Sequence, residues 1–266
     1  MKKIYTLLPI TIALLSGCQK NDVYLSENNS KSNYLKGAHL ENKPLAEIKE
    51  CSIVQITYSL GINNDILQFN YNASGDPVSI TRKFGAHTGG PNFLFQYDEK
   101  NRLTDFIGPY SHNTSAEFWH KYFYDNRGNI VLDSGYIFPQ ITNGSPTNAY
   151  IHQATYYSYD NKQRIIKDST VFAGSIQPVV NTYSYDINGN KTGSNYDDKI
   201  NLNRTNKIWM FLNRDYSVNN PYNAARYNTT GLPANLNLSQ GENPLKFLGN
   251  IFYKAEILYE CNPKAK

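Results

Sequence analysis

One short phrase recurs six times along the chain and constrains its fold more than any other feature. In "YFYDNRGNIVLD" two aromatic residues precede Asp125, which opens a turn, and Gly128 occupies the fourth position of that turn. Asp or Asn at the first position accepts hydrogen bonds from backbone N–H groups two residues on. The fourth residue adopts the positive φ of a G1 bulge, which glycine tolerates without a Cβ clash. Each phrase therefore predicts a β-hairpin.

The other five copies predict turns with the same two positions. One copy, "YSYDNKQRIIKD", has Gln163 in the fourth position, which weakens the predicted bulge there. Successive first positions are 26, 27, 35, 26 and 42 residues apart, and a period of this length accommodates two strands and a return loop. The first and fourth residues of these turns are Asn72 and Gly75, Asp98 and Asn101, Asp160 and Gln163, Asp186 and Gly189, and Asn228 and Gly231.

Alternation of apolar and polar residues extends over most of the chain after residue 50 and predicts an all-β fold. We expect an antiparallel β-meander of about 12 to 14 strands, built from hairpin repeats and either curved or closed into a barrel-like sheet. Only "TNKIWMFLNRDY" has a helical pattern of apolar residues, so we expect one short helical insertion there. The alternative is that this stretch plugs one end of the sheet.

The aromatic turn phrase resembles the YD repeat of the Rhs family, whose units read roughly Tyr-x-Tyr-Asp-x-x-Gly-Arg-Leu. The resemblance is closest at Phe95–Phe106 and Tyr122–Asp133 and extends over residues 66–237. In Rhs proteins, long arrays of such repeats build a β-sheet shell that can enclose a toxin. Six units are too few for a large sealed shell, so we do not expect the encapsulating role here. The chain is also similar to YD-like lipoproteins of the Bacteroidetes, most of which are uncharacterised.

The N-terminal residues 1–17 have the pattern of a secretory signal peptide. Lys2 and Lys3 precede an apolar run over residues 4–15, which is too short to span a membrane. The following "LSGC" matches the lipobox of bacterial lipoproteins, and this resemblance implies cleavage before Cys18 and diacylglycerol on its sulfur. The alternative is an ordinary signal peptide with an incidental cysteine. Residues 18–50 are polar and predict a tether, which precedes a single β-repeat domain over residues 51–266.

These N-terminal features predict a lipid-anchored protein of the cell envelope, at the outer membrane, with the displayed membrane face left open. Its membrane partner would be reached through the lipid anchor. Loss of Lys2 and Lys3 lowers the net charge from +4 to about +2. We therefore expect no nucleic-acid partner.

Two cysteines remain if Cys18 carries lipid. Cys51 opens the apolar strand "CSIVQITY" and Cys261 closes the strand "AEILYEC". In an oxidising compartment these two cysteines can form a disulfide, which would place the first strand beside the last. The alternative is two buried free thiols on strands that never meet.

The sequence contains none of the common catalytic or metal-binding motifs. The patterns "HExxH", "GxSxG" and the P-loop are absent, and the five histidines lack metal-ligand spacing. The stretch "DINGN" lacks the alternating acidic ligands of a calcium loop. We therefore expect no catalytic residue, no metal and no cofactor.

Two groups of residues remain as functional candidates. Asp197, Asp198 and Asp215 surround the predicted helix, where helix capping by Asp197 or Asp198 is favoured over catalysis. Among the 22 tyrosines, one recurs at the same position before the turns, which favours a cross-strand ladder over an exposed binding platform. These ladder residues are Tyr97, Tyr124, Tyr159 and Tyr185.

Together these features favour a non-enzymatic binding or scaffold module on the cell envelope, with a glycan or a protein as partner. We expect ligand specificity in the loops outside the repeat, residues 138–150 and 199–222. One alternative is an envelope hydrolase that uses the three carboxylates. Another is an accessory or remnant of an Rhs-type toxin system. The oligomeric state is left open.

Overall fold

The computed structural model describes residues 51–261 apart from residues 61 and 62. The predicted signal peptide, the lipidation site at Cys18 and the tether over residues 18–50 lie outside the described residues. Within the described part, no helix is long and apolar enough to cross a membrane.

Thirteen strands form one antiparallel sheet in the order β12-β11-β10-β7-β6-β5-β4-β3-β2-β1-β17-β14-β13. Two further pairs, β8–β9 and β15–β16, form small hairpins. The strands of the main sheet are β1 (Cys51–Leu60), β2 (Asn63–Tyr71), β3 (Pro77–Arg82), β4 (Phe93–Tyr97), β5 (Leu103–Pro109), β6 (Ala116–Tyr124), β7 (Ile130–Ile137), β10 (Tyr150–Tyr159), β11 (Ile165–Phe172), β12 (Val179–Thr182), β13 (Arg226–Tyr227), β14 (Pro233–Asn237) and β17 (Lys254–Cys261). The other elements are β8 (Gln140–Thr142), β9 (Ser145–Thr147), β15 (Leu245–Phe247), β16 (Asn250–Phe252), the 3-10 helix η1 (Leu202–Thr205) and the α-helix α1 (Lys207–Leu212).

The predicted antiparallel all-β sheet with one short helical insertion is confirmed. Of the two predicted forms, curved or closed, the sheet has the open one, because β12 and β13 remain as edges. The last strand, β17, pairs with the first, β1, but β14 and β13 continue the sheet beyond β17. Pairing of the terminal strands therefore does not close the sheet.

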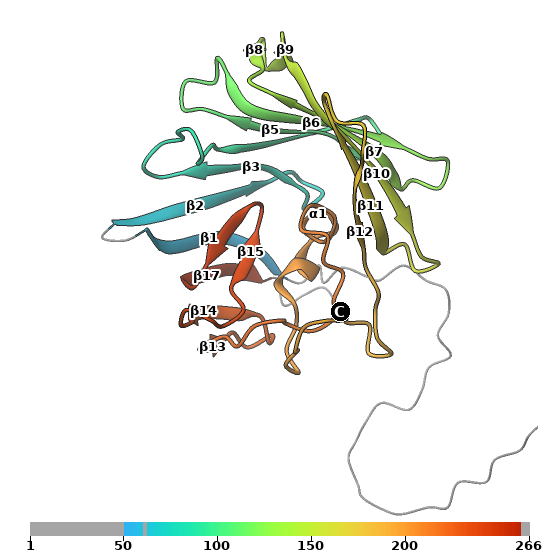
Figure 1. Cartoon of the computed structure of the whole chain (residues 1–266). Coiled ribbons are helices and arrows are strands. Elements are labelled where there is room, and N and C mark those ends of the chain that lie inside the picture. The colour runs from blue at the N-terminus through green and yellow to red at the C-terminus, as the bar shows by residue number, and fades with distance from the viewer. Residues whose placement is uncertain (1–50, 61–62, 262–266) are drawn as a thin grey trace, which may run out of the picture. The chain divides into compact units, whose positions relative to one another are not determined.

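The concave side of the sheet is filled by segments from the C-terminal part of the chain. Figure 1 shows the sheet curving around α1 and the hairpin β15–β16. Trp209 of α1 is fully buried, and its ring centroid lies 5.9 Å from that of Phe69, 5.7 Å from Phe95 and 5.2 Å from Phe247. Phe211 packs against one tyrosine of β6 and one of β10, each at 5.3 Å. The insertion thus supplies the centre of the core that the repeats surround.

Asparagines begin both helical segments of the insertion. The side chain of Asn206 accepts a hydrogen bond from the backbone N–H of Ile208 at 2.8 Å, which starts α1. Asn201 caps η1 in the same way. The prediction that Asp197 or Asp198 caps the helix is wrong, because asparagine is an equally good N-cap and lies next to each helix start.

Candidate functional site

All six repeat turns have the same backbone geometry. In the third turn, Asp125 Oδ1 accepts hydrogen bonds from the N–H groups of Arg127 and Asn129 at 2.9 and 2.8 Å. The fourth residue of every turn has a positive φ: Gly75 (81°), Asn101 (56°), Gly128 (85°), Gln163 (59°), Gly189 (86°) and Gly231 (84°). The first residues Asn72, Asp98, Asp160 and Asn228 accept the same pair of bonds, and Asp186 accepts the second of them. The bulge is therefore retained at Gln163.

A tyrosine in front of each of the first five turns joins one strand to its neighbour. The hydroxyl of Tyr159, which precedes Asp160, donates to the carbonyl of Ile130 at 2.7 Å. The equivalent bonds run from Tyr71 to Ile53 (2.7 Å), from Tyr97 to Pro77 (2.6 Å), from Tyr124 to Leu103 (2.7 Å) and from Tyr185 to Ile165 (3.2 Å). Tyr185 differs from the others because it lies after the edge strand β12 and not within a strand. We call these five bonds the tyrosine staples.

The tyrosine staples hold these side chains against the sheet through hydrogen bonds to backbone carbonyls. Burial raises the pKa of all five hydroxyls well above the ordinary value for tyrosine. Arginines that follow two of the turns stack on the next staple tyrosine, Arg102 at 4.7 Å from the ring centroid of Tyr124 and Arg164 at 4.0 Å from that of Tyr185. The arrangement is a cross-strand ladder, and it does not leave these rings free as a binding platform.

The sixth turn departs from this pattern because its strand, β13, is an edge of the sheet. Tyr227 precedes Asn228 but has no further hairpin to bond, and its hydroxyl donates to Asp197 of the insertion. On the other side of this turn, Tyr259 of β17 donates to the carbonyl of Pro233 at 2.8 Å. The repeat is interrupted where the insertion meets its last unit.

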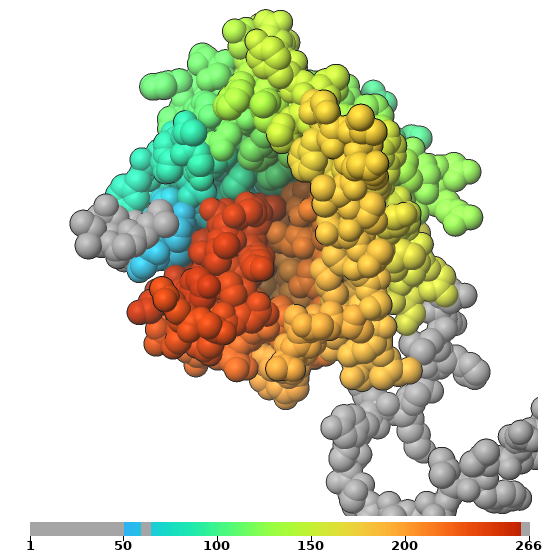
Figure 2. Space-filling view, in the orientation of Figure 1, coloured from blue at the N-terminus to red at the C-terminus, as the bar shows by residue number. Residues whose placement is uncertain are grey.

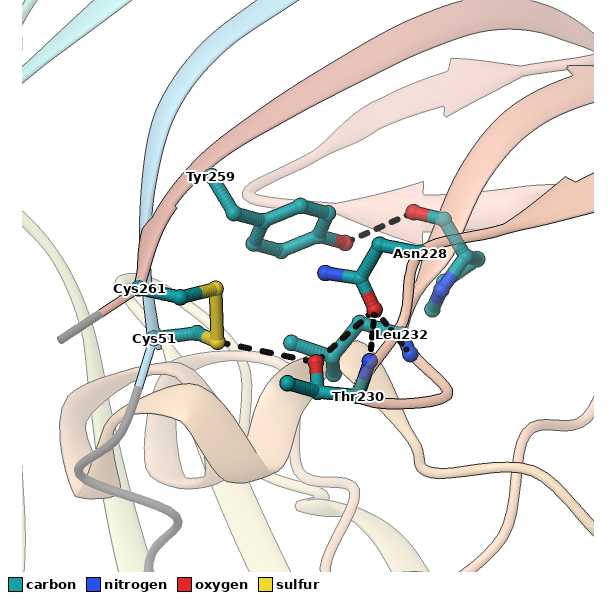
Figure 3. The surroundings of a disulfide bond; sticks show 7 residues. Cys51, Asn228, Thr230, Leu232, Tyr259 and Cys261 are labelled. Carbon is teal, nitrogen blue, oxygen red and sulfur yellow. Dashed lines mark hydrogen bonds between the residues drawn. A yellow bond between two sulfur atoms is a disulfide. The ribbon is translucent and has the colours of Figure 1, made fainter. Parts of the chain in front are cut away.

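The structure brings Cys51 and Cys261 together as directly paired residues of β1 and β17, with their sulfurs joined in a disulfide (Figure 3). The bond spans 210 positions of the sequence. The last turn packs beside it, with Thr230 Oγ1 at 3.6 Å from Cys51 Sγ. This bridge links the first hairpin of the repeat to the end of the described chain.

The three candidate carboxylates are bound separately rather than brought together. Asp198 is largely exposed and pairs with Lys199 at 2.9 Å. Asp197 accepts from the backbone N–H of Lys199 at 2.8 Å and from Tyr227. Asp215 Oδ2 accepts from the amides of two asparagines of η1 and its N-cap, at 2.8 and 3.2 Å. These contacts give each carboxylate a structural partner and do not build a shared catalytic centre.

One histidine in the described part has a carboxylate partner. His120 Nδ1 lies 2.8 Å from Oδ1 of Asp133, which is 3 % exposed, and Tyr157 donates to the same carboxylate at 3.4 Å. Among the described residues, no group of three or more His, Cys, Asp or Glu side chains is arranged to hold a metal ion. His120 and Asp133 form a partly buried polar contact between β6 and β7.

The two loops in which we expected specificity lie in different places. Residues 138–150 contain the hairpin β8–β9, and Phe138 and Tyr150 at its base are 57 % and 71 % exposed. Residues 199–222 turn inward and contribute to the core. The two flanks of this second segment come together at the surface.

These flanks form an open depression of about 400 Å³ where the repeat is interrupted. It is lined from three separate stretches of the chain, residues 193–197, 221–223 and 242–243. Its polar lining side chains include those of Asn195, Tyr196, Asp197, Asn223, Glu242 and Asn243. Amides, carboxylates and a tyrosine ring in one depression offer donors, acceptors and an apolar face to a polar ligand.

Buried asparagines hold the walls of the depression in place. Asn220, which is fully buried, donates to Asp197 Oδ2 at 3.3 Å. Asn190 donates to Asn219 at 3.0 Å, and Asn219 donates through its backbone N–H to Asn190 at 2.8 Å. Ser217 donates to the hydroxyl of Tyr196 at 3.1 Å. Such supporting bonds fix the orientation of lining side chains before any ligand arrives.

Most of this depression was not predicted from the sequence. Asp197 was considered only as a cap or a catalytic group, and Glu242 and Asn243 were not singled out. The available signal was the density of asparagine between residues 190 and 228, where the tyrosine phrase is absent. Buried amides at that density indicate a side-chain network in place of a strand ladder.

Comparison with known proteins adds little to this picture. No family model matches the chain, and no curated protein matches it in sequence. Solved structures that match include the crystal structure of TcdB2–TccC3–Cdc42, at 13 % identity and a TM-score of 0.25 over 50 % of this chain and 8 % of that one. Another is the crystal structure of TcdB2–TccC3–TEV, with the same identity and TM-score over 70 % of this chain and 11 % of that one. The chain spans about a tenth of the length of these relatives, and likeness at this level carries no argument about function.

Proposed function

We propose that this protein is a lipid-anchored, non-enzymatic binding module of the cell envelope, and that its ligand is a glycan. The ligand occupies the depression between residues 193–197, 221–223 and 242–243. The β-hairpin repeat holds this depression as a rigid scaffold.

The observation that carries the proposal is the chemistry of the depression. Side-chain amides and carboxylates can pair with sugar hydroxyls in both directions, and a half-buried ring such as Tyr196 gives a sugar face an apolar contact. The network of buried asparagines behind the lining reduces the entropy lost on binding. By contrast, the tyrosines of the repeat are already committed to the staples.

A glycan array with the purified chain tests the proposal, and Asn223→Ala is the informative variant. Asn223 lines the depression and is exposed, so its removal leaves the fold intact. Loss of one or two hydrogen bonds should weaken binding of the best glycan about three- to tenfold. Asn70→Ala is the matched control, because Asn70 is exposed on β2 outside the depression and bonds only to Ser79. Absence of any glycan above background, or equal loss in both variants, would refute the proposal.

The anchor is tested separately by the intact mass of the protein purified from its own membrane. The proposal predicts a mass in which residues 1–17 are removed and acyl chains are attached to Cys18. Protease treatment of whole cells then distinguishes display at the surface from display in the periplasm. An unmodified cysteine at position 18 would remove the anchor from the proposal but leave the glycan site to be judged on its own.

A further inference from the structure

The strand β12 forms one edge of the main sheet and has a neighbouring strand on one side only. All four of its side chains are exposed, and Val179 and Val180 are exposed by 52 % and 47 %. In Figure 2 the gold segment that contains β12 lies on the surface, facing the viewer. An edge strand of this kind offers unpaired backbone groups to a further strand.

The pairing of β12 with β11 shows which backbone groups point outward. The N–H of Tyr183 donates to the carbonyl of Ile166 at 2.8 Å, and the register continues without a shift along β12. Successive residues of a strand direct their N–H and C=O groups to opposite sides. Asn181 therefore points toward β11, whereas Val180 and Thr182 direct their backbone groups away from the sheet.

The free part of this edge is short and has a defined limit at each end. Pro178 precedes β12 and has no N–H to donate. Beyond the strand, the carbonyl of Ser184 accepts from the N–H of Thr192 at 2.8 Å, so the chain itself covers the edge there. The unpaired edge is therefore confined to residues 180–182.

This edge also lacks the charged side chains that usually protect an exposed strand. Residues 169–185 contain no Asp, Glu, Lys or Arg, although 18 % of the whole chain is charged. The opposite edge, β13, has only two residues and carries the exposed Arg226. Because β12 is uncharged, it can meet an identical strand without repulsion between like charges.

One antiparallel register lets two such edges use all of their free groups. When Asn181 lies opposite Asn181 of a second copy, Val180 of each copy lies opposite Thr182 of the other. Each of these pairs then exchanges both N–H···O=C bonds. A register shifted by two residues would place Thr182 opposite Pro178, which has no N–H. The opposite shift would place Val180 opposite Ser184, whose carbonyl already has a partner.

We propose that two copies of this chain associate through β12, with the two strands antiparallel about Asn181 and the two sheets continuous across the contact. Each chain has one edge of this kind, so the contact is the same on both copies and association ends at a dimer. A pair of short strands is a small interface, and we expect a dissociation constant of about 10–100 µM. This dimer does not depend on the proposed glycan binding.

Cross-linking of a single introduced cysteine tests the register. The experiment uses the full chain with Cys18→Ser, which prevents lipidation and leaves Cys51 and Cys261 joined to each other. Opposed residues of a pair without mutual hydrogen bonds have Cα atoms about 4.5 Å apart, which a disulfide can span. Asn181→Cys should therefore form a covalent dimer when oxidised with diamide. Leu258→Cys is the control, because Leu258 is 50 % exposed on the interior strand β17, and it should stay monomeric.

Sedimentation equilibrium of the chain with Cys18→Ser measures the association itself. The proposal predicts a reversible monomer–dimer equilibrium. Val180→Pro removes an N–H that points away from the sheet and keeps the bonds to β11, so it should weaken the dimer about tenfold or more. Val180→Lys adds a charge to the edge and should also weaken it about tenfold, with an unchanged circular dichroism spectrum. Leu258→Lys should leave the dimer unchanged.

Three results would overturn the proposal. One is a chain that stays monomeric up to about 500 µM, which would also be the result if this edge served only a strand of another protein. Another is equal cross-linking of Asn181→Cys and Leu258→Cys. The third is an equal effect of Val180→Lys and Leu258→Lys on the dimer.

Discussion

The shell of repeats, residues 51–192, and the insertion over residues 193–225 use different means to reach the same rigidity. In the shell, one turn geometry and one tyrosine bond recur along the sheet. In the insertion, asparagines cap the helices and bind carboxylates without a repeating pattern, and the core contacts converge on Trp209. A repeated bond distributes stability over many equivalent positions, whereas the insertion concentrates it in a few side chains. The non-repeating region also supplies most of the lining of the depression over residues 193–197, 221–223 and 242–243.

Alkaline pH is expected to give the largest effect, because it acts on all the tyrosine staples together. Burial raises the pKa of these hydroxyls in the folded state above the unfolded value near 10. Their contribution to stability is therefore complete below pH 10 and is lost as the pH rises through the folded values. Denaturant unfolding followed by circular dichroism should give a midpoint that is flat from pH 8 to 9.5 and falls steeply above 10. A midpoint unchanged at pH 11 would show that the staples contribute nothing.

Substitution of the two tryptophans compares the stability that the insertion contributes with the stability that the shell contributes. Trp209→Ala removes the fully buried centre of the core and should lower the free energy of unfolding by about 3–5 kcal/mol. Trp119 lies half-buried on β6, stacked on Tyr136 at 4.5 Å, and Trp119→Ala should lower it by about 1–2 kcal/mol. Urea denaturation of both variants measures the difference. Equal losses of unfolding free energy would mean that the insertion does not contribute more to stability than the shell.

The disulfide tests whether the shell and the C-terminal region unfold as one unit. Replacing Cys51 and Cys261 together by alanine should lower the free energy of unfolding by about 2–4 kcal/mol, since the bond closes a loop of 210 positions. The variant should still unfold in one transition, because β1 and β17 remain paired through their backbone. Non-reducing peptide mapping of the wild type checks the pairing itself, and free thiols at both positions would contradict it.

A single staple should contribute modestly. Tyr159→Phe removes the bond to Ile130 and should lower the free energy of unfolding by about 1 kcal/mol. Tyr156→Phe, on the same strand but 53 % exposed, is the control and should change it by less than about 0.5 kcal/mol. Chemical denaturation of the pair measures the difference, and no difference would mean that the hydroxyl bond is not what joins the hairpins.

The smallest expected effect is a gain of stability from a substitution in the fourth turn. Gln163→Gly should raise the free energy of unfolding by about 0.5–1 kcal/mol, because glycine relieves the strain of φ at 59°. Gly128→Ala, the reverse change at the equivalent position of the third turn, should lower it by a similar amount, since a Cβ there meets no atom within 4 Å and only the backbone is strained. Thermal denaturation of both variants should show shifts of opposite sign. Shifts of the same sign would contradict the equivalence of the turns.

The shell could be predicted from sequence because its information is local. Asp125, Gly128 and the preceding aromatic residues specify a hairpin within a dozen positions, and the repetition reinforces the interpretation. The strand count and the antiparallel arrangement followed directly. That the sheet stays open could not be predicted. It depends on whether β14 and β13 pair beyond β17, and this is set by contacts between residues far apart in the sequence.

The depression and the insertion were harder to predict because they too depend on contacts between residues far apart in the sequence. Asn220 and Asp197 are brought together across 23 positions, and Glu242 reaches the same depression from another loop. No periodicity marks such contacts. Helix capping by aspartate was a wrong inference because Asn206 and Asn201, which supply the caps, look like ordinary polar residues in the sequence.

The most direct test of the central claim is hydrogen–deuterium exchange of the protein with and without the best glycan from the array. That claim is that the repeat is a scaffold and that ligand contacts lie where it is interrupted. The account predicts slower exchange in peptides covering residues 193–197, 221–223 and 242–243, with unchanged exchange at the first five repeat turns. Protection confined to those turns or to the hairpin β8–β9 would contradict it.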